Sequence, residues 1–367
     1  MRVRLMPESS IYDVTVIGGG PAGTSTAITA ARSGARVLLL EAGKFPRHKV
    51  CGEFVSPESL KLLETLLDSN GLDLLRDATK ISSARIFVDG RVVKTEIAPA
   101  AASIARIDLD QALWSSAERS GMDVKQQVKV TGIDGSGPFA VRSSVGTFET
   151  RAVVNAAGRW SNLRRLSADT GNGRPKWIGL KAHFEENEPS PSVDLYFFNG
   201  GYCGVQPVGE SRVNACAMVR ADVASKLEEI VQLHPELEQR ALQWRELMDP
   251  ISVAPLVFEE PQPIRNGIFN VGDAAGFVDP FVGDGISLAL QSGALAARCL
   301  CENKFSIVEA SGMYRSSYER QLAPVFRSSS RIRRMLALPG AVRKPIVALI
   351  STLPTITEYL VKKTRIA

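Results

Sequence analysis

The 367 residues, 44% of them apolar, are enough for one large hydrophobic core or two smaller ones and too evenly mixed for a disordered chain. Five scattered cysteines without a C-x-x-C pair, and only three histidines, argue against a disulfide framework and against a structural zinc or haem site. The net charge of +5 is uneven, because residues 320–367 carry ten Lys or Arg against the single acid Glu358. We therefore expect free thiols, no metal and a basic C-terminal surface, with no nucleic-acid motif.

The opening segment predicts a strand, a helix and a second strand. An apolar strand over 12–17 breaks at glycines, continues as an Ala-rich helix and leads to another apolar strand closed by Glu41. Gly18, Gly20 and Gly23 form a G-x-G-x-x-G pattern at the first junction. The first glycine permits the tight turn, the second lets the backbone approach a pyrophosphate, and the third lets helix and strand pack closely. With Glu41 as acceptor for ribose hydroxyls, this unit predicts a site for the ADP half of a dinucleotide.

The middle of the chain alternates between strand and helix patterns. Strand-like alternation covers 81–98, 124–154 and 177–220, and helical patterns cover 59–67, 109–120 and 223–248. A short apolar strand at 267–271 then meets a Gly-Asp pair and a Gly-rich run, followed by an Ala-rich helix to about residue 301. No second G-x-G-x-x-G occurs, which argues against a separate nicotinamide-binding domain.

Three blocks, residues 18–41, 155–159 and 272–285, together resemble the flavoprotein superfamily of aromatic hydroxylases, geranylgeranyl reductases and flavin halogenases. The match covers most of residues 11–303. It implies FAD as cofactor and an α/β fold: a Rossmann-type, glutathione reductase-like FAD-binding domain with an inserted mixed β-sheet substrate domain and a C-terminal helical tail. The implied division assigns 1–80, 105–176 and 263–303 to the FAD-binding domain, 81–104 and 177–262 to the substrate domain, and 304–367 to the basic tail.

The resemblance also implies cofactor contacts. Asp273, beside Gly272, matches the family aspartate on the flavin ribityl chain. The run that matches the segment beside the isoalloxazine ring, where a helix N-terminus favours negative charge on reduced flavin, contains Pro280, Gly283, Gly285 and Ile286.

Two arginines and one further glycine complete the predicted cofactor set. Arg106 matches a family arginine that reaches the cofactor and suits a pyrophosphate, although a surface arginine at a helix start is equally compatible with the pattern. Arg47 is a candidate to assist the phosphates. Gly158 belongs to an Ala157-Gly158 pair at the position where the hydroxylases carry Asp-Gly, and the lost aspartate weakens the hydroxylase interpretation.

The loop Arg47-x-Lys49-x-Cys51-Gly52 is similar to the geranylgeranyl reductase branch, which makes this branch the nearest of the three. Cys51 is a candidate redox or proton-delivering thiol, since a thiolate is favoured near two cations, or else a small packed residue. Glu53 departs from the glycine usual in that branch and resembles the Gly-Glu of the halogenases. It is either a carboxylate near the flavin or a loop charge.

Residues 201–207 lie where the halogenases carry W-x-W-x-I-P and the prenyl reductases Y-x-W-x-F-P. Only Tyr202 and Pro207 remain here, which disfavours halogenation. Gly204 replaces a tryptophan and opens volume over the flavin, and Gln206 adds a hydrogen-bonding group. The substrate is therefore expected to differ from a plain prenyl diphosphate.

Three hypotheses follow. The first is an FAD-dependent oxidoreductase that reduces a carbon-carbon double bond of a hydrophobic isoprenoid or polyketide-like substrate, with Cys51 or Tyr202 as proton donor and NAD(P)H or a reduced protein as electron donor. The second is an FAD-dependent monooxygenase of an aromatic or polyketide product, in which Gln206 and Glu53 orient the substrate. The third is an FAD-binding electron carrier without a substrate of its own.

The location of the protein is predicted from its two ends. The first ten residues stay polar and contain no apolar leader, which predicts a cytoplasmic protein. In the tail, prolines and charges interrupt each apolar run short of the roughly 20 residues that a transmembrane helix needs. The tail is expected either to lie on a membrane surface as a peripheral contact or to pack its apolar side on the substrate domain.

Overall fold

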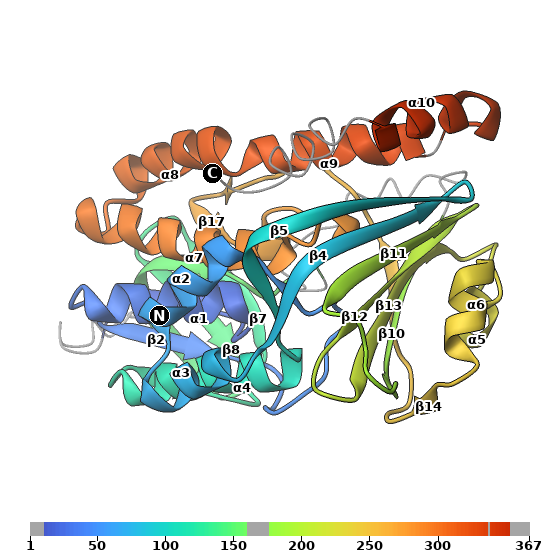
Figure 1. The fold of residues 1–367 in the computed structure, drawn as a ribbon. Helices are drawn as coiled ribbons and strands as arrows, with labels where there is room; N and C mark the ends of the chain where they lie inside the picture. Colours follow the sequence, from blue (N-terminus) through green and yellow to red (C-terminus); the bar gives the residue numbers. More distant parts are fainter. Residues whose placement is uncertain (1–10, 160–175, 337, 353–367) are drawn as a thin grey trace.

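The structure, a computed structural model, describes residues 11–159, 176–336 and 338–352. Two β-sheets organise this part of the chain, one of eight strands flanked by helices and one of nine strands (Figure 1). The predicted α/β fold with a mixed second sheet and a helical C-terminal region is confirmed.

The first sheet is built around parallel strands. Its members are β1 (Tyr12–Ile17), β2 (Val37–Leu40), β6 (Asp123–Lys125), β7 (Val130–Gly135), β8 (Phe139–Ser143), β9 (Gly146–Asn155), β16 (Ile264–Arg265) and β17 (Ile268–Asn270). The order is β16-β17-β9-β1-β2-β6, with β7 and β8 attached beside β9. From β17 to β6 all neighbours run parallel, which is the arrangement of a dinucleotide-binding fold.

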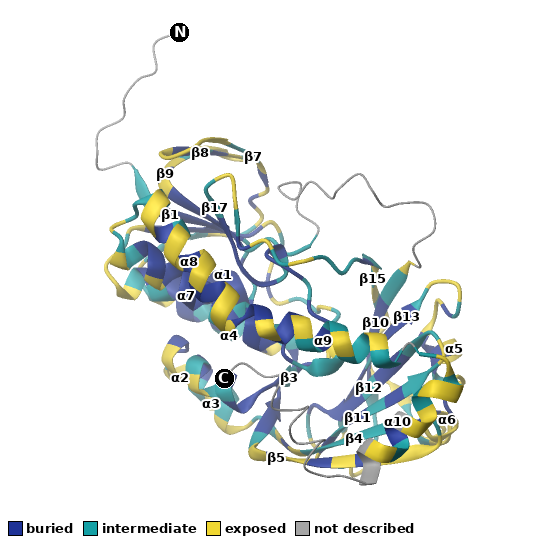
Figure 2. Cartoon of the chain, turned by 90° about the horizontal axis from the view of Figure 1, so that it is seen from above, coloured by how far each residue is buried: buried dark blue, intermediate teal, exposed yellow. Residues whose placement is uncertain are grey.

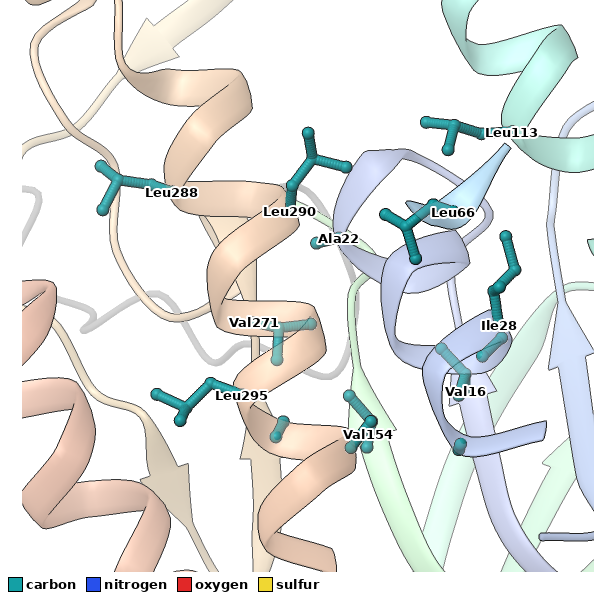
Figure 3. Close-up of a cluster of buried hydrophobic side chains, with 14 of the residues drawn as sticks. Val16, Ala22, Ile28, Leu66, Leu113, Val154, Val271, Leu288, Leu290 and Leu295 are labelled. Carbon is teal, nitrogen blue, oxygen red and sulfur yellow. The ribbon is translucent and has the colours of Figure 1, made fainter. Parts of the chain in front are cut away.

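Six helices of the described chain pack on this sheet and on one another. They are α1 (Pro21–Arg32), α2 (Pro57–Leu66), α3 (Ser69–Arg76), α4 (Arg106–Arg119), α7 (Gly285–Glu302) and α8 (Ile307–Gln321). Buried apolar side chains such as Val16, Ile28 and Leu290 meet in one core between β1, α1 and α7 (Figure 3). Gly293 permits this contact, because a Cβ there would lie 2.2 Å from the carbonyl oxygen of Ala22. The N-terminal and C-terminal segments thus form one core.

The second sheet contains strands from the first, middle and later parts of the chain. Its strands are β3 (Phe54–Val55), β4 (Thr79–Val88), β5 (Arg91–Ser103), β10 (Trp177–Glu185), β11 (Ser192–Phe198), β12 (Gly201–Pro207), β13 (Arg212–Arg220), β14 (Arg245–Glu246) and β15 (Ile251–Leu256). The order is β14-β10-β13-β12-β11-β4-β5-β3, with β15 also on β10. Because β11 and β4 pair in parallel while the other pairs are antiparallel, the sheet is mixed.

One predicted element is wrong. Residues 223–248 do not form a single amphipathic helix but two short ones, α5 (Leu227–Val231) and α6 (Pro235–Ala241), followed by β14. Pro235 lacks a backbone N–H and its ring would clash with the carbonyl four residues earlier, so no helix runs through it: α5 has ended at Val231, and the proline begins α6.

The C-terminal helices extend from the first sheet to the second. Helix α9 (Ala323–Leu336) follows α8, and α10 (Gly340–Thr352) lies over the long β4–β5 hairpin (Figures 1 and 2). Arg343 on α10 donates to Asp89 at the hairpin turn, with Nη2 2.7 Å from Oδ1. No helix in the described ranges is long and apolar enough to cross a bilayer. The rest of the predicted tail, 353–367, and the polar first ten residues lie outside the described residues.

Candidate functional site

A cavity of about 930 Å³ lies between the two sheets and reaches α9 and α10. It gathers every predicted site residue except Gly23. The predicted residues that line it are Gly18, Gly20, Glu41, Arg47, Cys51, Glu53, Arg106, Gly158, Tyr202, Gln206, Gly272, Asp273, Pro280, Gly283, Gly285 and Ile286. Residues from five separate parts of the chain therefore meet at one site.

The glycines of the first turn differ in their surroundings. Gly18 has φ +107° and a Cβ there would lie 2.4 Å from the carbonyl oxygen of Ala156, while a Cβ at Gly23 would lie 1.8 Å from that of Gly18. At Gly20 an added Cβ would meet nothing within 4 Å. Helix α1 begins here with no side-chain cap and no acid in its first turn, which leaves its N-terminal amides for an anion. The turn is thus packed on the protein side and open on the cavity side.

Glu41 is held firmly at the cavity wall. Its Oε2 accepts from the Gly19 amide at 2.7 Å and its Oε1 from the Gly43 amide at 2.6 Å. Arg47 Nη2 lies 3.0 Å from the same Oε1, and Arg47 Nε has no hydrogen-bond partner among the described residues. Glu41 therefore provides a fixed hydrogen-bond acceptor at the predicted nucleotide end, and Arg47 Nε provides a donor without a partner among the described residues.

A second group of backbone features faces the cavity from the C-terminal half of the first domain. The 3₁₀ turn η2 (Gly272–Ala274) starts at φ +56°, and the 3₁₀ turn η3 (Pro280–Val282) ends at Gly283 with φ +76°. Helix α7 then begins at Gly285, where an added Cβ would meet nothing within 4 Å. Asp273 Oδ2 lies 3.4 Å from Nε of Arg159. These elements present an open helix N-terminus and a carboxylate to the cavity.

Arg106 is paired within the protein. Its Nε and Nη2 donate to the two carboxylate oxygens of Asp110, each at 2.7 Å. Burial opposes the charged guanidinium, yet the pKa of Arg106 is raised, because Asp110 and the side chain of Cys51 outweigh the burial. The predicted contact of Arg106 with the pyrophosphate stays a prediction.

Glu53 lies in the interior rather than on a surface loop. It is fully buried, has φ +64°, and accepts from Lys181 Nζ, from His183 Nε2 at 2.8 Å and from the Arg106 amide at 2.7 Å. Burial acts to raise the pKa of this carboxyl, but His183 and Lys181 outweigh it and the pKa is lowered. Glu53 is therefore an ionised carboxylate at the cavity wall with both oxygens engaged.

The sequence interpretation missed Lys181 and His183. Both lie on β10, two residues apart and hence on one face of the strand. Polar residues at alternate positions of an otherwise apolar strand were the available signal. Their burial beside a carboxylate from residue 53 depends on the tertiary fold.

The candidate proton donors have different environments. Cys51 Sγ accepts from the Glu53 amide at 3.3 Å. Tyr202 is buried, its hydroxyl has no partner among the described residues, and burial raises its pKa well above the ordinary value. Gln206 Nε2 donates to Ser103 Oγ at 2.6 Å, so its amide is already fixed from one side.

Asp279, an acid near Tyr202, has a raised pKa. Asp279 is 2% exposed, and burial raises its pKa to about 7, with Arg333 Nη1 3.8 Å away as a weak counter-ion. Because Arg333 lies on α9, this contact ties the C-terminal helices to the loop before η3. It is a second feature that the sequence interpretation did not identify.

The end of the cavity away from the first turn is apolar. It is enclosed by β4, β5 and β11 on one side and by α9 and α10 on the other. The side chains that line it are Ile86, Val88, Val93, Ile97, Val193, Leu195, Phe197, Ile332, Met335, Leu336 and Val347. Apolar side chains of α9 and α10 thus line the cavity opposite the second sheet, as in the packing alternative predicted for the tail.

Comparison with known proteins agrees with this architecture. Residues 11–325 match the family described as FAD binding domain, so the chain belongs to that family. It is an FAD-dependent oxidoreductase, as predicted, and its cofactor is FAD.

Two curated relatives span nearly the whole chain. Menaquinone reductase of Mycolicibacterium smegmatis is 26% identical, over 94% of this chain and 90% of that protein. Digeranylgeranylglycerophospholipid reductase 2 of Methanothermobacter thermautotrophicus is 28% identical, over 89% and 88%.

Two solved structures share the fold. A geranylgeranyl bacteriochlorophyll reductase-like protein of Thermoplasma acidophilum aligns with a TM-score of 0.77 and 23% identity, over 97% of this chain and 96% of its own. A flavin-dependent brominase aligns with a TM-score of 0.79 and 19% identity, over 96% and 93%. The predicted superfamily is confirmed.

Proposed function

We propose that this oxidoreductase reduces a carbon-carbon double bond of a long hydrophobic, isoprenoid or polyketide-like substrate. The observation that carries the proposal is the continuous cavity, which joins the glycine-rich turn and the α7 N-terminus to an apolar space under α9 and α10. An electron carrier without a substrate has no need of such a space. Two relatives that are named as reductases support the same reaction class.

The residues of the cavity fit FAD. Gly20 and Gly285 leave open space at the two helix N-termini, and Arg47 and Arg159 each retain a buried donor atom without a partner in the described part of the chain. The turn at 18–23 and the start of α1 would hold the pyrophosphate, with Arg47 and Glu41 beside it. Asp273 and residues 280–286 would hold the flavin portion. When bound and reduced, FAD supplies the hydride.

The protein itself supplies binding, exclusion of water and a proton. Apolar side chains from the substrate sheet and from α9 enclose the chain of the substrate and keep water away. Cys51 and Tyr202 both line the cavity, where their side chains can contact the substrate. The raised pKa of Tyr202 keeps its hydroxyl protonated at neutral pH, so it can donate a hydrogen bond to the substrate.

We further propose that the tail contacts the surface of an anionic membrane, from which such a substrate would enter. Helix α10 exposes Val342 and Leu349, and α9 and α10 also expose basic side chains, among them Arg334 and Lys344. Sedimentation with vesicles tests this: binding to anionic vesicles and none to neutral ones is expected, and loss of binding in Val342→Ser/Leu349→Ser would follow. Recovery with anionic vesicles that is no higher than without vesicles would remove the membrane from the proposal.

The reaction is tested by anaerobic turnover with a polyprenyl quinone and with an unsaturated isoprenoid lipid, using chemically reduced enzyme or NAD(P)H. We expect oxidation of the flavin together with a product whose isoprenoid chain has gained two hydrogens, counted after any quinol has been reoxidised to the quinone. A strict requirement for O2, with an oxygen atom in the product, would favour the monooxygenase alternative.

A further inference from the structure

His48 lies in the loop that was expected to provide Cys51, and its side chain lines the cavity. Its Nδ1 is shielded from solvent and has no hydrogen-bond partner among the described residues. An imidazole nitrogen buried without a partner is costly unless a ligand or a proton transfer uses it. This nitrogen is the first observation behind the inference.

A cluster of buried polar and charged side chains lies next to His48. The His183 ring meets the His48 ring edge-on, with centroids 5.7 Å apart, and His183 Nε2 is bonded to Glu53. Because ionised Glu53 only accepts hydrogen bonds, His183 must donate from Nε2, which fixes its tautomer on that side. Lys181, with no exposed surface, completes the group.

The backbone of Glu53 adds a third observation. Its φ of +64° lies in the left-handed region, which favours glycine. A non-glycine residue held there persists only where its surroundings compensate the strain, and such residues cluster at functional sites. Here the compensation is the set of three donors to the carboxylate.

We propose that His48 is a catalytic acid–base residue of this cavity, and that Glu53, Lys181 and His183 are positioning residues that set the orientation and proton affinity of its ring. The inference rests on the reductase function proposed above. His48 as imidazolium would release a proton to the substrate carbon that does not receive the hydride. The N–H bond breaks, a C–H bond forms with the electron pair of the former double bond, and the neutral imidazole regains a proton from water.

The surrounding charges act on His48 in opposite senses. Burial, Lys181 and His183 lower its pKa, whereas Glu53 on its own loop and Asp108 on α4 raise it, and the pKa is lowered overall. A lowered pKa makes the imidazolium a stronger acid, at the cost of its population at neutral pH.

The first test is an imidazole NMR titration of the FAD-loaded protein, which needs no turnover. The chain has three histidines, so His48→Gln, His183→Gln and His234→Gln assign every signal. We expect His48 to titrate below 6.5, at a lower pH still in Glu53→Gln and at a higher pH in His183→Gln. His234 lies beside Phe87 and Tyr196, away from the cavity, and His234→Gln is the control that leaves the His48 signal in place. A His48 titration midpoint near pH 6.5 that is the same in wild type, Glu53→Gln and His183→Gln would overturn the positioning role.

The second test compares pH profiles of turnover. His48→Gln should lower kcat about 10²- to 10⁴-fold at unchanged FAD content and remove the limb of the profile that follows His48, whereas Cys51→Ala and Tyr202→Phe keep that limb. An unaltered rate and profile in His48→Gln overturns the proposal. Should the wild-type protein reduce no double bond, the function proposed above fails, and the NMR titration still decides whether Glu53, Lys181 and His183 control His48.

Discussion

The two ends of the cavity are built by different means. The nucleotide end, where the cofactor phosphates are predicted to bind, uses backbone: the glycines at 18–23 and the N-termini of α1 and α7. The substrate end, where we propose that the substrate binds, uses side chains from the loop around Cys51, from the second sheet and from α9 and α10. A backbone site is specified by clearance and φ over a few residues, whereas a side-chain site is specified by tertiary packing. The first end is therefore sensitive to a single Cβ, and the second end tolerates changes of shape.

The largest effect is expected at the nucleotide end, from Gly23→Val. A Cβ at this position would lie 1.8 Å from a backbone oxygen that cannot move without breaking the turn, so we expect aggregated protein without FAD. Yield of soluble protein and flavin absorbance measure the outcome.

The matched variant is Gly20→Ala, where the Cβ enters open space. The apoprotein should unfold at the same denaturant concentration as wild type, while FAD binding weakens at least about tenfold, because the methyl group occupies the approach to the pyrophosphate. Fluorescence titration with FAD measures this. Unchanged affinity in Gly20→Ala would refute a pyrophosphate at this turn.

The next effect concerns the buried charges beside the substrate end. Glu53→Leu leaves Lys181 buried without its carboxylate and should lower the free energy of unfolding by about 3–5 kcal/mol at pH 7. The double variant Glu53→Leu/Lys181→Met should lose less than the single variant, because it removes both charges. Denaturant unfolding measures both variants, and additive losses would show that the two side chains do not interact.

The same pair predicts a pH dependence. The pKa of Glu53 is lowered in the folded state, so its contribution to stability is present above the unfolded value near 4.5 and is lost as pH falls through the folded pKa. The difference in unfolding free energy between wild type and Glu53→Leu should therefore be constant from pH 7 to about 5 and shrink in more acidic solution. A difference that grows on acidification would contradict an ionised Glu53.

Gly204→Trp is expected to disturb the fold less than these variants and to weaken the use of long substrates selectively. A Cβ at Gly204 would meet the flexible end of Leu195 at 3.3 Å, so the backbone accepts a side chain. The indole should fill the substrate end, leave FAD content unchanged and raise KM for long substrates at least about tenfold. Gly204→Ala is the control with near wild-type kinetics. Equal losses for short and long substrates would place Gly204 away from the substrate path.

The smallest effect is expected at the tail. Arg343→Met removes the ion pair to Asp89 and should cost at most about 1 kcal/mol, because the guanidinium is partly exposed and water screens the pair. Limited proteolysis of the segment after α9 should become faster. Unchanged proteolysis would show that apolar packing alone holds α10 on the β4–β5 hairpin.

The same contrast between a backbone site and a side-chain site explains which parts of the structure the sequence predicts. Residues 12–41 carry their own periodicity, glycines and acid, so the strand, turn, helix and strand are predictable locally, and β1, α1 and β2 match the prediction. Most of the glycines and the Asp273 block also reach the cavity as expected. The single helix predicted over 223–248 fails because the apolar spacing continues across Pro235, whereas the backbone does not.

The substrate end was less accessible to the sequence interpretation. His48 occupied an unassigned position between two basic residues, and Lys181 and His183 lie about 130 residues from Glu53 along the chain. Ile332 and Val347 line the cavity only because α9 and α10 fold back over the second sheet. Such contacts depend on tertiary packing and have no local pattern.

The most direct test of the account is a single turnover of enzyme that holds one equivalent of reduced FAD, mixed without O2 with an unsaturated isoprenoid substrate. The account predicts that the flavin returns to its oxidised spectrum and that one double bond per FAD gains two hydrogens, as measured by mass spectrometry. A flavin that stays reduced until O2 is admitted, with substrate unchanged or oxygenated, would contradict it.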